Sequence, residues 1–117
     1  MDKQELQMRL KQYALRIIRL SRALPNSPEG WIVKKQIIRC GTSVGANYRA
    51  ACRARSKAEF IAKLGIVIEE ADESAWWLEI IIEAGLMKKN LVTSLLQETN
   101  EILAIMIGSR TTAQKRL

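Results

Sequence analysis

Two pairs of carboxylates have the spacing that catalysis or metal binding would require. Glu69 and Glu73 lie four residues apart, as do Glu79 and Glu83, so on a helix the members of each pair share one face. Such a pair can hold a metal ion or share a proton. The chain contains no histidine, which excludes Ser-His-Asp and Cys-His catalysis, histidine-ligated zinc and the di-iron bundles. We therefore expect no enzymatic activity, no catalytic residue, no metal and no cofactor, and we interpret these glutamates as salt-bridge partners.

Basic side chains form the second set with a chemical use. The 117 residues include 19 lysines and arginines against 12 aspartates and glutamates, a formal net charge of +7 that favours anionic partners. The net charge is +4 in residues 1–24 and +5 in residues 28–55, whereas residues 56–85 carry −5. Without a helix-turn-helix, RNP or zinc signature, this surplus predicts binding to the backbone of RNA or DNA with little sequence preference.

The candidate nucleic-acid-binding residues lie in the first two predicted helices. They are Arg9, Arg16, Arg19, Lys34, Lys35, Arg39, Arg49 and Arg53, with Arg22 and Arg55 in the same basic set. The alternative is a solvated face, because several of these cations are expected to pair with the acidic segment.

The cysteines and the apolar runs bear on the compartment. Cys40 and Cys52 lie twelve residues apart and form no Cys-x-x-Cys motif, so we expect free thiols in a reducing cytoplasm. The first five residues are mostly polar and lack the apolar core of a signal peptide, and the longest apolar runs are too short to span a bilayer. The sequence therefore predicts a soluble, cytoplasmic protein with no membrane partner.

Helical periodicity predicts the elements that must position these side chains. Apolar residues recur every three or four positions in four segments, which predicts an all-α, up-down-up-down antiparallel four-helix bundle in a single domain, residues 1–117. The predicted helices are residues 3–24, 28–54, 57–85 and 88–108, followed by a basic tail, 109–117, without period. Ser27 with Pro28 predicts one helix start, the capping box of Ser56 and Glu59 predicts the next, and Gly85 predicts a left-handed helix end.

Small and polar residues in the second predicted helix permit two interpretations. Gly41 and Gly45 lie one turn apart, and either they let two helices of one bundle pack closely or they admit a neighbouring subunit. Ser43 and Asn47 are also one turn apart, and we expect a polar network with Glu70 or Glu73, the alternative being simple exposure to solvent.

A family resemblance rests on the stretch from Cys40 to Leu78. Its motifs are Ser43-Val44-Gly45-Ala46-Asn47-Tyr48-Arg49, Ala54-Arg55-Ser56, Glu59-Phe60, Lys63-Leu64, Glu69-Glu70-Ala71 and Trp77-Leu78-Glu79. On these motifs the sequence resembles the bacterial four-helix bundle proteins encoded in intervening sequences of 23S rRNA genes. The structural motif residues that the resemblance assigns are Ser43, Asn47, Ser56, Glu59, Glu70 and Trp77. Family members commonly have an acidic residue where this chain has Ala50.

The resemblance implies a bundle fold, no known enzymatic activity and a homopentamer. A distant relative of the family is an accessory subunit of diversity-generating reverse transcriptases and binds nucleic acid, which implies RNA, DNA or a protein such as a reverse transcriptase as a possible partner.

Apolar residues outside the main seams indicate where subunits would meet. Trp76 and Trp77 cannot both face one core, because adjacent helical residues diverge by about 100°. The candidate residues of an oligomer interface are Trp76, Ile61, Ile68 and Ile82. We expect Trp31 to plug one end of the bundle rather than to stack on a nucleobase.

Two functional hypotheses follow. The first is a non-enzymatic, homo-oligomeric bundle, with a pentamer favoured, that binds nucleic acid or a nucleic-acid-handling partner through a basic surface. The alternative is an assembly module that recognises only protein. Ionic strength distinguishes them, because phosphate binding weakens steeply with salt.

Overall fold

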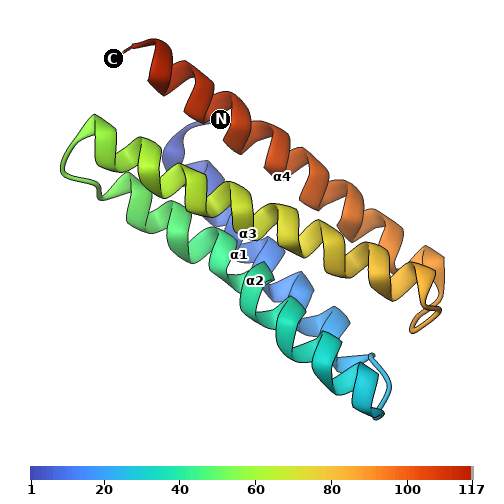
Figure 1. The fold of residues 1–117 in the computed structure, drawn as a ribbon. Coiled ribbons are helices and arrows are strands. Elements are labelled where there is room, and N and C mark those ends of the chain that lie inside the picture. Colours follow the sequence, from blue (N-terminus) through green and yellow to red (C-terminus); the bar gives the residue numbers. More distant parts are fainter. Residues whose placement is uncertain (117) are drawn as a thin grey trace.

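Four helices make up the computed structural model, which describes residues 1–116. They are α1 (Lys3–Arg22), α2 (Pro28–Cys52), α3 (Lys57–Glu83) and α4 (Lys89–Lys115). Consecutive helices run in opposite directions and lie side by side (Figure 1). No strand occurs in the described residues. The predicted all-α, up-down-up-down bundle is confirmed.

Side-chain caps set the starts of α2 and α3 where the sequence predicts them. Ser27 Oγ accepts a hydrogen bond from the Gly30 N–H at 3.1 Å, and Ser56 Oγ accepts one from the Glu59 N–H at 3.1 Å. The reciprocal bond of the capping box is displaced by one residue, because Glu59 Oε2 accepts from the N–H of Arg55 at 3.3 Å.

The end of α3 is a left-handed turn at Gly85, as predicted. Gly85 has φ of 68°, a region that favours glycine. The N–H of Leu86 donates to the Ile81 carbonyl at 3.0 Å, and the N–H of Gly85 donates to Ile82 at 3.1 Å. This pair of bonds is a Schellman motif, which satisfies carbonyls at the helix end and turns the chain toward α4.

The seam between α1 and α2 is tight because α2 supplies glycines there. A Cβ atom at Gly45 would lie 3.2 Å from the Cβ of Leu10 and 3.3 Å from its carbonyl oxygen. Gly41 is buried against Ile17 of α1. The structure thus places both glycines in packing within one chain, which is the first of the two interpretations of this small-residue face.

The end of α4 corrects the sequence-based prediction. A helix ending at Gly108 and an irregular tail over 109–117 are wrong for the described residues, because α4 continues to Lys115. Ala113, seven residues after Met106, returns to the core face and is only 9% exposed. The Lys57 ammonium also donates to the Arg116 carbonyl at 3.3 Å. These contacts outweigh the cost of a glycine inside a helix, about 1 kcal/mol. Residue 117 lies outside the described residues.

The membrane prediction can be compared with the helices directly. Within the described chain, none of the four helices is both long and apolar enough to cross a membrane.

Candidate nucleic-acid interface

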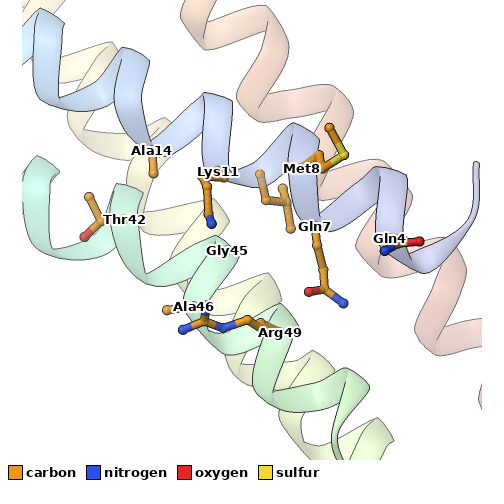
Figure 2. A pocket seen from close by; sticks show the side chains of 10 residues that line it. Gln4, Gln7, Met8, Lys11, Ala14, Thr42, Gly45, Ala46 and Arg49 are labelled. Carbon is orange, nitrogen blue, oxygen red and sulfur yellow. The ribbon is translucent and has the colours of Figure 1, made fainter.

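A groove of about 330 Å³ runs along the outer side of the α1–α2 pair (Figure 2). It exists because the residues facing each other across the seam are small, namely Ala14 on α1 and Thr42, Gly45 and Ala46 on α2. Glutamines and cations border it. Figure 2 shows Lys11 and Gln7 extending from α1 toward α2, and Arg49 lying along α2 beside Ala46.

The groove is the centre of a larger basic face. Thr42 and Arg49 line the groove, and Lys35 precedes Thr42 by two helical turns, so it lies on the same side of α2. Arg53 is likewise two turns beyond Ala46, and Arg22 is three turns beyond Lys11. We call this set the basic face, and its members, all exposed, are Lys11, Arg22, Lys35, Arg49 and Arg53.

The basic face has little negative charge near it. None of its five cations forms an ion pair within residues 1–116. Residues 1–55 contain only three acidic residues, Asp2, Glu5 and Glu29, and all three lie at or within the first turn of α1 or α2. The face therefore presents a positive potential to solvent.

Two of the predicted binding residues on α1 instead face α4. Arg9 forms a two-point hydrogen bond with Glu98, at 2.9 Å and 2.6 Å, and lies 3.6 Å from Glu101. The Arg9 guanidinium lowers the pKa of Glu98 through these hydrogen bonds, and Glu98 raises the pKa of Arg9 in return. Arg16 donates to Ser94 Oγ at 3.1 Å. Both arginines hold α1 against α4.

Arg39 is similarly engaged, with α3 as its partner. It lies 3.3 Å from Glu70 and forms an ion pair with Glu73, which also accepts a hydrogen bond from Trp77 Nε1 at 3.1 Å. The hydrogen bond from Arg39 lowers the pKa of Glu73. Arg39 therefore contacts the two glutamates, Glu70 and Glu73, that the sequence analysis expected to bond Ser43 and Asn47.

The expected network from Ser43 and Asn47 to α3 is wrong. Ser43 Oγ donates to the Arg39 carbonyl at 2.6 Å, and Asn47 Nδ2 donates to the Ser43 carbonyl at 2.8 Å. Both side chains therefore bond one turn back along α2, the usual competing partner for a short polar side chain in a helix.

The last two predicted binding residues lie beside the basic face. Arg19 is exposed and lies about one turn beyond Arg16, which contacts α4. Lys34 is half-buried and lies two turns before Gly41, on the side of α2 that meets α1. The structure thus groups three of the eight predicted residues, Lys35, Arg49 and Arg53, and adds Arg22 from the wider basic set.

Lys11 was missed by the sequence analysis. Its position follows from the register of α1 against α2, in which Leu10 lies opposite Gly45. The short connection between α1 and α2 could have predicted this register. In an antiparallel helical hairpin, one pair of facing residues determines which other residues face each other.

The predicted interface residues separate into two groups. Trp76 is 58% exposed on α3. Ile68 and Ile82 are half-buried against the core of their own chain, as is Trp77, and Ile61 is half-buried. The three isoleucines named for the interface therefore do not form an exposed stripe on α3. Trp31, expected to plug the bundle end, is 56% exposed.

The carboxylates named at the outset are mostly unpaired. Of the two i,i+4 pairs, only Glu73 forms an ion pair within residues 1–116, while Glu69, Glu79 and Glu83 are exposed. No group of three histidine, cysteine or acidic residues in the described chain is arranged to hold a metal ion.

Four antiparallel helices with a basic groove on one outer side define a small basic helical-bundle protein. A family model described as 23S rRNA-intervening sequence protein matches residues 3–108. The chain belongs to the 23S rRNA-intervening sequence protein family, as its motifs indicated.

A solved structure supports this membership. The chain is similar to a protein of unknown function from the S23 ribosomal protein family of Bacteroides thetaiotaomicron, with 36% identity and a TM-score of 0.83. The match covers 89% of this chain and 96% of that one. Among curated proteins, no sequence matches the chain.

Proposed function

We propose that this protein binds the phosphate backbone of nucleic acid through the basic face of α1 and α2. The observation that carries the proposal is the separation of the cations into two groups. Arg9, Arg16 and Arg39 are engaged with α4 or α3, whereas the five cations of the basic face surround a groove that no acidic side chain lines within the described residues.

The chemistry of the groove favours the backbone over the bases as the site of contact. Lys11 and Arg49 supply charge for phosphate oxygens, and Gln4 and Gln7 supply amide donors. No aromatic side chain on which a base would stack is among the residues that line the groove. Contacts of this kind fix position and affinity but carry no sequence information.

Salt dependence tests the proposal. Each phosphate contact contributes about −0.9 to the slope of log K against log salt on duplex DNA, so five cations predict a slope of about −4 to −5. Fluorescence anisotropy with a labelled duplex between about 50 and 200 mM salt measures this slope. The triple variant Lys35→Gln, Arg49→Gln, Arg53→Gln is expected to reduce its magnitude by about 3.

A matched control variant loses the same number of positive charges at positions outside the basic face. Lys88→Gln, Lys89→Gln, Lys115→Gln removes three exposed cations from the ends of α4 and is expected to leave the slope nearly unchanged. Equal effects of the two triple variants would show that only net charge matters. No binding by the wild type at the lowest salt would refute the proposal.

Self-association is the second candidate, and exposed residues of α3 favour it. Trp76 is 58% exposed, and Glu69, Asp72, Glu79 and Glu83 are exposed on the same helix. This acidic, tryptophan-centred surface is complementary in charge to the basic face of a second copy, and tryptophan is enriched among the residues that dominate interface energy. Because the two surfaces differ, such a contact joins copies head to tail and closes into a ring if the rotation permits.

Light scattering tests the second candidate. Assembly predicts a mass that is a multiple of 13.3 kDa, and Trp76→Gln is expected to return it to that of one chain. Leu91→Gln is the matched control, because Leu91 is also 58% exposed but lies at the start of α4. Since both candidates use the basic face, added duplex DNA should dissociate the assembly if both are correct. A single-chain mass for the wild type would exclude self-association.

A further inference from the structure

A second pocket lies at the end of the bundle where α1 and α3 begin and α2 and α4 end. Its volume is about 740 Å³, and all four helices line it. In Figure 1 this is the end that carries both chain termini and the α2–α3 connection. It is separate from the groove of the basic face, since the two share no lining residue.

The pocket has an apolar floor. Leu6, Tyr48 and Ala51 are buried, with exposed fractions of 4%, 3% and 1%, and they meet half-buried Phe60 and Ile105. A volume between about 300 and 1,000 Å³ with a mainly apolar lining is typical of small-molecule sites. The floor therefore suits the apolar body of a ligand.

The rim of the pocket is cationic. Lys3, Lys57 and Arg116 come from three different helix ends, and no acidic side chain lines the pocket among the described residues. Lys3 Nζ lies 4.7 Å from the centroid of the Phe60 ring, and Lys57 Nζ donates to the Arg116 carbonyl. Two acidic side chains that neighbour the lining residues in sequence are engaged in caps. Asp2 accepts from the Glu5 N–H, and Glu59 accepts from the Arg55 N–H.

A phenol on the floor supplies a further polar contact. Tyr48 forms no side-chain hydrogen bond to an oxygen or nitrogen within residues 1–116, and its polar neighbour is the thiol of Cys52, a weak partner. Burial raises the pKa of Tyr48, so its hydroxyl stays protonated at neutral pH and is available as a donor.

We propose that this end pocket binds a small amphiphilic anion. The alkyl or other apolar body lies against Leu6, Ala51 and Ile105, and the carboxylate or phosphate head group accepts hydrogen bonds from Lys3, Lys57 and Arg116. Apolar burial supplies most of the affinity, and the unpaired cations select for negative charge.

Titration of the ¹⁵N-labelled full chain with octanoate and with octyl phosphate tests the proposal by NMR. We expect saturable shifts confined to residues that line the pocket, such as Ala51, Cys52 and Ala113. Octanol is expected to bind at least tenfold more weakly, and octyltrimethylammonium not to bind. The two anions distinguish a carboxylate from a phosphate head group.

Gly108 offers a variant that fills the pocket without disturbing the fold. It lines the pocket, and a Cβ atom there would have no neighbour within 4 Å. Gly108→Leu also raises helix propensity, so the chain is expected to fold and the shifts to disappear. Gly65→Ala is the matched control, because it makes a similar helix substitution outside the pocket and should leave binding intact.

Charge and accessibility give two further readouts. Lys3→Gln with Lys57→Gln changes exposed side chains only and is expected to lower affinity for both anions at least tenfold. Bound anion should also slow alkylation of Cys52, which lines the pocket, whereas Cys40 is fully buried.

Three results would overturn the proposal. They are the absence of saturable shifts with either anion, equal binding of the alkylammonium, and shifts that persist in Gly108→Leu. The basic-face triple variant leaves this pocket unaltered, so loss of nucleic-acid binding and loss of anion binding can be told apart.

Discussion

Gly41 of α2 lies so close to Ile17 of α1 that a Cβ atom at position 41 would stand 2.8 Å from both Cγ1 and Cγ2 of Ile17. Ile17 is fully buried and branched at Cβ, so its side chain has little freedom to move aside. The separation of the first two helices is therefore set by the absence of a side chain at this position.

The first prediction concerns that contact. Gly41→Ala gains helix propensity of about 1 kcal/mol, but overpacking at a rigid site costs about 1–3 kcal/mol, so we expect a net loss of stability. Gly108→Ala has the same propensity gain with open space around the new methyl group, and it is expected to stabilise the protein. Urea denaturation of both variants measures whether each substitution raises or lowers the free energy of unfolding. An increase for Gly41→Ala would contradict the packing described.

The second prediction concerns alkaline pH. Burial raises the pKa of Tyr13 from 10.0 to about 12, and the Tyr13 hydroxyl lies 2.6 Å from Thr99 Oγ1. Because the neutral phenol is favoured in the folded state, its stabilising contribution is complete below pH 10 and is lost as the pH rises through about 12. Urea denaturation at a series of fixed pH values between about 9 and 12 should show this fall in the free energy of unfolding.

Tyr13→Phe provides the check on that assignment. It removes one hydrogen bond, at a cost of about 0.5–1.5 kcal/mol near neutral pH, and it should make the alkaline fall shallower. The fall that remains belongs to Tyr48 and Cys40, whose pKa values are also raised by burial. If the free energy of unfolding of Tyr13→Phe falls with alkaline pH as steeply as that of the wild type, other groups cause the fall.

The third prediction concerns acid. Arg9 lowers the pKa of Glu98 below its usual 4.5, so the stabilisation from this pair is present above pH 4.5 and is lost as the pH falls through the lowered value. Arg9→Gln should reduce the free energy of unfolding by about 1–2 kcal/mol at neutral pH and weaken the acid dependence. Arg39→Gln should have a smaller effect, because the Arg39 side chain is 48% exposed against 25% for Arg9.

The fourth prediction concerns the end of α4. Removal of residues 109–117 deletes the buried Ala113 and the hydrogen bond from Lys57 to the Arg116 carbonyl. We expect a loss of about 1–3 kcal/mol in the free energy of unfolding and a loss of helical circular dichroism larger than an irregular tail would give. Unchanged stability would mean that this last part of α4 contributes nothing to the fold.

Local signals made most of the fold predictable. Ser27, Ser56 and Gly85 act at the positions their residue types favour, since caps and left-handed turns depend on a few neighbouring residues. The end of α4 was not predictable in this way. Gly108 is a local stop signal, and it is overridden by the burial of Ala113 and by the hydrogen bond from Lys57 of α3, which a single-helix pattern does not reveal.

The candidate site was less predictable because it depends on register between helices. Charge counting placed the surplus on the first two helices, but Arg9, Arg39 and Lys11 have roles that only the pairing of helix faces decides. Arg9 meets Glu98 across 89 residues of sequence, and Arg39 meets Glu73 across 34. Which cations remain unpaired is thus a property of the whole bundle.

The seam between α1 and α4 has a consequence for the order of folding. Arg9 and Glu98, Tyr13 and Thr99, and Arg16 and Ser94 are separated by 89, 86 and 78 residues. The other helix pairs in contact are joined directly by short connections, so closing them costs far less chain entropy. The three hairpins are expected to form before this seam closes. In stopped-flow measurements, Thr99→Val should therefore accelerate unfolding and leave the folding rate nearly unchanged, whereas a change at the α1–α2 contact should slow folding.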